Sequence, residues 1–359
     1  MTTKLVYVLT CADDKHYIEQ ALMAVYSARH WTPDAYIVLL VDNRTDSLLE
    51  GKRSEILKYV SEKIIVPFED DALSPAYRSR FIKTSLRQRI SGDFLFIDCD
   101  TITTRKLDCI DDLTCQVGAV PDSHLRVNEF GLSLLSATKA NVQSMDIDLE
   151  KEDYYFSSGV MYVKDTGDTH RLYARWHALW LAGIKKGVII DQPSLAKANI
   201  EIGHLINRMD DRFNCVMYTQ PVFAKDAFIL HFTAYRNPSW LFSEQVYRIL
   251  QNEGIPEWLR AYILNPLSTY IPFRYTLYKS NLKNIMAFAH QIGKNARIYG
   301  KQVDSSFSGM QSANKWHKLA RKFFRGKCYL FGGILCIFPA WISMRMHPAN
   351  PPLANICSK

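Results

Sequence analysis

The chain has 359 residues, of which 48% are hydrophobic and 22% are charged, a balance that excludes an intrinsically disordered protein. Its eight cysteines form no C-x-x-C pair and no regular spacing, which excludes a disulfide scaffold and a cysteine zinc site and favours a reducing compartment. The net charge of +8 is uneven, because residues 258–359 carry +14 and residues 1–257 carry −6, so an acidic body precedes a basic C-terminal region.

Short apolar runs alternate with helical patterns in the first hundred residues. Residues 4–10 and 35–42 are almost continuously apolar, as in strands covered on both faces, and apolar residues recur at helical spacing from Ile18 to Ala28 between them. The elements expected next are a helix at 48–59, a strand at 64–66, a helix at 76–90 and a strand at 94–97. This order predicts βαβ units and a mostly parallel sheet with helices on both faces. Such sheets bind ligands beyond the carboxyl ends of their strands, which points to the loops after Thr10 and Ile97.

The strand at 94–97 ends in two aspartates with one residue between them, Asp98 and Asp100. Carboxylates on alternate residues at a fixed strand end can reach a hard divalent cation, directly or through its waters, and such a cation commonly bridges phosphate oxygens. Alternatively, both aspartates are turn residues that only terminate the strand.

Five segments across residues 4–240 carry a family resemblance. In chain order they are VYVLTCADDKHY, YRSRFIKTSLRQRISGDFLFIDCDTI, YYFSSGVMYVKD, IIDQPSLAKA and ILHFTAYRNPSW. Their order and spacing resemble the GT-A glycosyltransferases, specifically the retaining family 8 group that includes glycogenin and the lipopolysaccharide galactosyl- and glucosyltransferases. The resemblance implies an α/β, Rossmann-like GT-A fold with a mixed, mostly parallel sheet flanked by helices. The catalytic domain would span residues 1–255, and a basic, largely helical region would span residues 256–359.

The resemblance also implies a metal centre. Asp98, Asp100 and His231 would hold Mn²⁺, or Mg²⁺, on the diphosphate of a nucleotide sugar, most simply a UDP-sugar. A neutral imidazole beside two carboxylates suits Mn²⁺ better than Mg²⁺. Without the resemblance, a histidine at position 231 would more often be a core residue than a ligand.

Further residues would bind the nucleotide and its diphosphate. By the same match, Asp13 would meet the uracil or ribose, with Thr10 and Tyr17 near the base; as plain sequence this loop is also compatible with a solvent-facing turn. Arg80 would contact the diphosphate or the sugar, and Lys83 lies one turn later on the same helix face. The alternative is a solvated helix face that Arg80 shares with three other arginines: Arg78, Arg87 and Arg89.

The donor sugar would lie against two further segments. Asp191 would bind sugar hydroxyls and Gln192 would lie close to the anomeric carbon. Asp191 could also act as the N-cap of the following helix, and both roles can hold together. Ser157 and Ser158 stand where the family has Asn and Ser or Ala, so one sugar-contacting side chain is shorter and the donor identity is open.

The last motif departs further from the family pattern. The family has Gly and Lys where this chain has Ala234 and Asn237, and Trp240 falls one residue late. Arg236 is the neighbouring residue that would supply the missing positive charge.

The activity implied is metal-dependent transfer of a hexose, with retention of configuration, from a UDP-sugar to a glycan or lipid-linked glycan in bacterial surface polysaccharide synthesis. Asp191, Gln192 and Arg80 would be the catalytic residues. The segment 121–153, expected to be variable in structure, lies where the family keeps acceptor-binding or lid elements. Two alternatives are a haloacid-dehalogenase-like phosphohydrolase, with Asp98 as nucleophile and Asp100 as acid, and a non-catalytic sugar-nucleotide-binding protein. The D-x-D-x-T pattern of the phosphohydrolases normally lies on the first strand.

The N-terminal apolar run is too short for a signal peptide, so we expect a cytoplasmic protein, peripheral at the inner face of the cell membrane. Residues 315–327 carry six Lys and Arg and no acid, with aromatic residues at helical spacing, and residues 328–344 are apolar but short of a spanning helix. The segment 315–344 is therefore expected to dock on an anionic membrane surface. The alternative is that it packs on the acidic body; nucleic acid is not expected as a partner.

Overall fold

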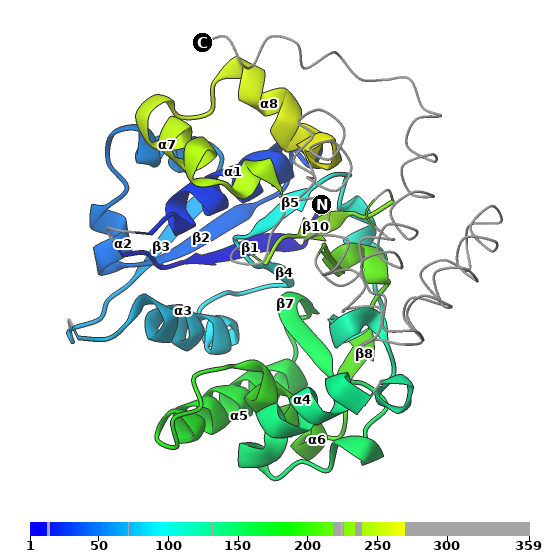
Figure 1. The fold of residues 1–359 in the computed structure, drawn as a ribbon. Coiled ribbons are helices and arrows are strands. Elements are labelled where there is room, and N and C mark those ends of the chain that lie inside the picture. The colour runs from blue at the N-terminus through cyan, green and yellow to red at the C-terminus, as the bar shows by residue number, and fades with distance from the viewer. Residues whose placement is uncertain are drawn as a thin grey trace, which may run out of the picture. The chain divides into compact units, whose positions relative to one another are not determined.

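The computed structural model describes residues 1–269 except 13–14, 71, 131, 218–223, 225 and 234–238 (Figure 1). The strands in chain order are β1 (Lys4–Leu9), β2 (Ile37–Asp42), β3 (Glu62–Val66), β4 (Phe94–Ile97), β5 (Thr101–Thr103), β6 (Val117–Pro121), β7 (Phe156–Val163), β8 (Ile206–Arg208), β9 (Cys215–Val216) and β10 (Ile229–His231). The α-helices are α1 (Tyr17–Trp31), α2 (Asn43–Ser47), α3 (Pro75–Thr84), α4 (Leu132–Val142), α5 (Gly167–Ile184), α6 (Gln192–Glu201), α7 (Glu244–Glu253) and α8 (Glu257–Leu264).

The main sheet has seven strands in the order β3-β2-β1-β4-β7-β6-β8. Neighbouring strands are parallel except at β7, which runs antiparallel to both β4 and β6. A second sheet has three strands in the order β5-β10-β9, with β10 antiparallel to β5. The prediction of an α/β fold with a mixed, mostly parallel sheet is confirmed.

The strands are buried because helices cover both faces of the main sheet (Figure 1). All six residues of β2 are buried, which explains its continuous apolar sequence. Alternate strand residues such as Val6, Val38 and Phe96 pack in one core cluster with Ile82 of α3 and Trp176 of α5. Helices α1, α7 and α8 lie together on the other side, where α8 packs against α1 and β5.

Two predicted helices differ from the structure. Within the stretch predicted at 48–59, the chain forms a 3-10 helix, Gly51–Lys58, that begins at a glycine with a positive φ of 53°. The helix predicted at 76–90 corresponds to α3, which ends six residues earlier, at Thr84. The Ser85 hydroxyl donates to the carbonyls of Phe81 and Ile82, which competes with continued helix.

The antiparallel direction of β7 places its first residues at the edge where β4 and β6 end. Ile97 pairs with Val160, and Pro121 pairs with Phe156. The residues that follow β4 and β6 therefore lie beside the start of β7, and one edge of the sheet gathers side chains from three strands.

Within the described residues, we find no helix of the length and apolar character needed to cross a bilayer. The predicted membrane-docking segment, 315–344, lies outside the described residues, as does most of the predicted C-terminal region.

Candidate metal centre and active site

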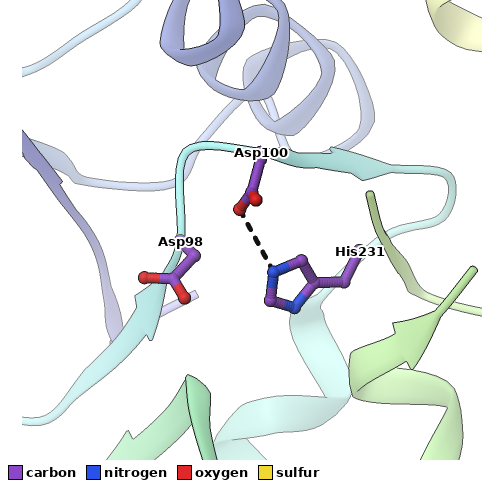
Figure 2. A group of neighbouring side chains, drawn as sticks. All are labelled: Asp98, Asp100 and His231. Carbon is purple, nitrogen blue, oxygen red and sulfur yellow. Dashed lines mark ion pairs between the residues drawn. The ribbon is translucent and has the colours of Figure 1, made fainter. Parts of the chain in front are cut away.

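Three metal-ligating side chains meet at the edge of the main sheet where β4 ends. Asp98 follows β4, Asp100 precedes β5, and His231 is the last residue of β10, opposite Thr101 of β5. One ligand atom of each side chain lies within 4.8 Å of those of the other two (Figure 2). Two carboxylates and an imidazole suit a divalent cation such as Mn²⁺. The side chains therefore fit the metal that the sequence predicts.

Burial and charge shift the pKa values of these ligands. Burial raises the pKa of the Asp98 carboxyl, and the positive charges of Lys83 and His231 offset this only in part. Burial would lower the pKa of His231, but Asp100, whose Oδ1 lies 3.1 Å from His231 Nε2, raises it above the usual value. Carboxylates held this close together and partly out of water favour a bound cation.

Gly159 of β7 leaves the space that two of the ligands occupy. A Cβ atom on this residue would lie 2.6 Å from His231 Cε1 and 3.0 Å from Asp98 Oδ2. The Gly159 carbonyl also accepts a hydrogen bond of 2.9 Å from the Asp98 main-chain N–H. Any side chain at this position would displace the imidazole or the carboxylate, so the site requires glycine here.

Asn214 is a fully buried residue that the sequence analysis did not identify. Its Oδ1 lies 2.9 Å from His231 Nδ1, and its Nδ2 donates to Ser157 Oγ at 3.0 Å. Because an amide oxygen only accepts, a neutral His231 ring would carry its proton on Nδ1 and present the Nε2 lone pair to a cation held with Asp98 and Asp100. The contact depends on the packing of β10 beside a 3-10 helix, Asp211–Asn214, so no local motif indicates it.

Lys83 links the candidate metal ligands to Asp191. Its buried Nζ lies 3.4 Å from Asp98 Oδ1, 3.4 Å from Asp191 Oδ2 and 3.2 Å from Ser158 Oγ. Ser158 donates to Asp191 Oδ2 at 2.9 Å, and Arg80 Nε lies 3.6 Å from Asp191 Oδ1. Burial would raise the pKa of Asp191, but the charges of Lys83 and Arg80 hold it below the usual value. Asp191 is therefore a carboxylate between two cations.

The side chain of Asp191 does not cap α6. It makes no hydrogen bond to the first turn of that helix, so the capping interpretation is wrong. The main-chain carbonyl of Asp191 accepts hydrogen bonds from Trp176 Nε1 at 2.9 Å and from Ser194 Oγ at 2.7 Å. These bonds fix the backbone and leave the carboxylate facing the two cations.

Asp122 is a second residue that the sequence analysis did not identify. It follows β6, and its Oδ2 accepts a hydrogen bond of 3.2 Å from Gln192 Nε2. Burial raises its pKa, and the hydrogen bond from Gln192 opposes the shift. The next residues, Ser123 and His124, have φ values of 59° and 60°, a left-handed conformation that clusters at functional sites. The strand-end rule would have found Asp122 had β6 been recognised.

The solvated-face interpretation is wrong for two of the arginines near Arg80. Arg78 is buried, and its Nε lies 2.5 Å from Asp42 Oδ2 at the end of β2. Arg87 is also buried, and its Nη2 lies 3.2 Å from Asp165 Oδ2. Arg89 is exposed, as predicted for that face.

Of four residues predicted to bind the nucleotide or its phosphates, the structure describes only Thr10 and Tyr17. Thr10 is buried and its hydroxyl donates to the Pro75 carbonyl at 2.7 Å, whereas Tyr17 opens α1 and is 43% exposed. Asp13 and Arg236 lie outside the described residues. The nucleotide-binding roles of all four stay predictions.

The sequence matches no protein-family model and no curated protein. Three similar solved structures are all glycosyltransferases. Mouse xyloside xylosyltransferase 1 has a TM-score of 0.44 at 12% identity over 65% of this chain and 98% of its own. The bifunctional glycosyltransferase WbbM has a TM-score of 0.44 at 15% identity, over 65% of this chain and 46% of its own. The galactosyltransferase LgtC, in complex with donor and acceptor sugar analogues, has a TM-score of 0.45 at 16% identity, over 72% of this chain and 99% of its own.

Proposed function

We propose that the protein is a metal-dependent, retaining glycosyltransferase of the GT-A type. It would move a hexose from a UDP-sugar to a glycan or lipid-linked glycan acceptor in bacterial surface polysaccharide synthesis. The observation that carries this proposal is the meeting of Asp98, Asp100 and His231 with Lys83 and Asp191 at one edge of the sheet. This arrangement would place a cation site beside an ion-paired carboxylate, as a donor with a diphosphate and a sugar requires.

The charges of the site suit the departure of a diphosphate. Breaking the bond between an anomeric carbon and a diphosphate builds negative charge on the leaving phosphate and positive charge on the sugar ring. When bound by Asp98, Asp100 and His231, the metal would supply Lewis-acid stabilisation of that leaving group. Arg80, whose side chain is one third exposed beside Asp191, would add a fixed positive charge on the same side.

Asp191 is better suited to binding than to nucleophilic attack. Its Oδ2 already accepts from Ser158 and faces Lys83, and its Oδ1 faces Arg80. A carboxylate engaged at both oxygens is a weak nucleophile, which disfavours a covalent double displacement. We therefore favour a front-face route, in which the departing phosphate oxygen accepts the proton of the acceptor hydroxyl while Asp191 and Gln192 position the sugar.

The setting proposed is the cytoplasmic, inner face of the cell membrane, where lipid-linked acceptors are available. The support is the basic sequence of residues 258–359 and the run at 315–344. Ala234 and Asn237, the departures that bear on phosphate binding, lie outside the described residues.

The phosphohydrolase alternative is less well supported by the geometry. It would use Asp98 as nucleophile and Asp100 as acid, yet the Asp100 carboxylate lies 3.1 Å from the imidazole of His231, an arrangement suited to shared ligation of a cation. In addition, Asp98 follows the fourth strand in the chain instead of the first.

A screen of UDP-sugars tests the proposal. The wild-type protein should hydrolyse one UDP-hexose slowly with Mn²⁺ and not in EDTA, and with an acceptor the new linkage should keep the donor's anomeric configuration by NMR. Asp108→Asn, which removes an exposed carboxylate that pairs with Lys106 and with none of the candidate ligands, is the control that should keep activity. Turnover in EDTA, an inverted linkage, or phosphatase activity without sugar-nucleotide turnover would each contradict the proposal.

A further inference from the structure

The loop between α5 and α6 presents two large apolar side chains to solvent. Ile189 is 50% exposed and Ile190 is 46% exposed, directly before the buried Asp191 of the candidate active site. Single exposed apolar residues are common, but two adjacent isoleucines at the border of a site form a patch that a partner would cover.

The exposure of these isoleucines is fixed by the fold. The Ile189 carbonyl accepts a hydrogen bond of 3.0 Å from Nε1 of the buried Trp180, and the Val188 N–H donates to the Gly183 carbonyl at 3.0 Å. At the far end of the loop, Asp191 is held by its own main-chain bonds. Because both ends of the loop are tied to α5, the two side chains cannot turn inward without breaking buried hydrogen bonds.

The same loop carries two exposed cations. Lys185 and Lys186 follow the last turn of α5 and are exposed. Among the residues that the structure describes, no carboxylate lies within ion-pair distance of either ammonium group. Other surface lysines, such as Lys139 with Glu150 and Lys151 with Asp148, do have such partners. The loop therefore combines two exposed isoleucines with two lysines whose positive charges have no carboxylate partner among the described residues.

We propose that the loop of residues 185–190 contacts the surface of an anionic phospholipid bilayer. Lysines that meet lipid phosphates beside isoleucines that enter the headgroup region are the combination that interfacial binding uses. The basic run at residues 315–327 is a less suitable partner for this loop than a bilayer, because its six Lys and Arg would repel Lys185 and Lys186. A nucleic acid would match the charge and leave the isoleucines in water.

The use of this contact rests on the proposed function. A bilayer held at loop 185–190 would lie next to Asp191 and Gln192, so a lipid-linked acceptor would reach the donor sugar without leaving the membrane. Bilayer binding itself requires neither metal nor sugar nucleotide. It can therefore be measured independently of the transfer reaction.

The test is the partition of the full-length protein onto vesicles of phosphatidylcholine with phosphatidylglycerol, measured by flotation at low salt without nucleotide or metal. Lys185→Gln with Lys186→Gln should weaken binding on the order of tenfold or more, since each basic residue near an anionic surface contributes about fivefold. Ile189→Gln with Ile190→Gln should weaken it on a similar scale. Ile190→Trp should preserve or strengthen it, because tryptophan favours the interface.

Matched controls separate this contact from general charge and hydrophobicity. Lys52→Gln with Lys58→Gln removes two exposed lysines of another surface, and Ile65→Gln removes an isoleucine of β3 that is 45% exposed. Both should bind vesicles as the wild type does. The proposal is overturned if the loop variants bind like the wild type, or if the control variants lose as much binding as the loop variants do.

Discussion

Asn214 holds the His231 ring on the side opposite to Asp100. Asn214 meets Nδ1 at 2.9 Å, and Asp100 meets Nε2 at 3.1 Å. Asn214→Leu keeps a similar volume but removes the acceptor that fixes the tautomer and orientation of the ring. We expect Mn²⁺ affinity to fall by about 10- to 100-fold, the usual effect of losing an outer-shell partner. Titration of free Mn²⁺ by electron paramagnetic resonance measures it.

The control for this prediction is another buried asparagine. Asn199 is 5% exposed and accepts a hydrogen bond from the Ile206 N–H at 2.9 Å, in α6 away from the metal ligands. Asn199→Leu should destabilise the fold without changing Mn²⁺ affinity. Equal Mn²⁺ affinity in both variants would show that Asn214 is only a packed core residue.

His124 makes stability depend on pH. Burial lowers its pKa from 6.5 to about 4, and its Nε2 lies 2.9 Å from the Asn214 carbonyl. The folded state binds fewer protons than the unfolded state between these values, so stability is complete above pH 6.5 and falls as the pH drops towards 4. The loss is about 3 kcal/mol in the free energy of unfolding. Urea unfolding from pH 7.5 to 4.5 should show this slope, and His124→Gln should flatten it. If the two proteins had the same slope, another group would be responsible.

At the scale of elements, Arg78 joins α3 to the first two strands. Its Nε lies 2.5 Å from the buried Asp42 Oδ2 of β2, and its Nη2 donates to the Cys11 carbonyl after β1 at 3.3 Å. Arg78→Leu leaves Asp42 charged and unpaired, so we expect the free energy of unfolding to fall by about 3–5 kcal/mol. Arg89→Leu on the exposed side should change it by less than about 0.5 kcal/mol. Chemical denaturation compares the two, and equal losses would mean that the ion pair contributes little.

The elements that the sequence predicts best are those whose signal is local. Residues 4–10, 35–42 and 94–97 are almost continuously apolar because both faces of their strands are covered, and β1, β2 and β4 lie within these ranges. Asp98 and Asp100 could be identified because they end such a strand. The position of His231 beside them came from the family resemblance.

What the sequence did not predict depends on contacts between distant segments. Asn214 reaches His231 only through the pairing of β9 with β10, and Asp122 joins Gln192 only because β7 runs antiparallel. The pairing of Asp191 with Lys83 and Arg80 also depends on the fold, since the local sequence, an Asp before a helix, is equally compatible with an N-cap.

For the whole molecule, the division into an acidic body and a basic C-terminal region predicts that the C-terminal region contributes membrane affinity in addition to that of loop 185–190. Residues 1–257 carry −6 and residues 258–359 carry +14. A version ending near Gln311 should therefore bind anionic vesicles more weakly than the full chain, and added salt should reduce the difference. Sedimentation with liposomes measures both. If the two versions bound vesicles equally, or if neither bound, docking through residues 315–344 would be contradicted.

The measurement that tests the central claim most directly is calorimetric titration of UDP into the protein with Mn²⁺ and with EDTA. The account predicts that wild-type protein binds UDP tightly only with Mn²⁺, because Asp98, Asp100 and His231 would hold the cation that attracts the diphosphate. Asp98→Ala and His231→Ala should lose that metal-dependent affinity while remaining folded, and Asp108→Asn should keep it. UDP binding of the same strength in EDTA, or unchanged Mn²⁺ dependence in both ligand variants, would contradict the account.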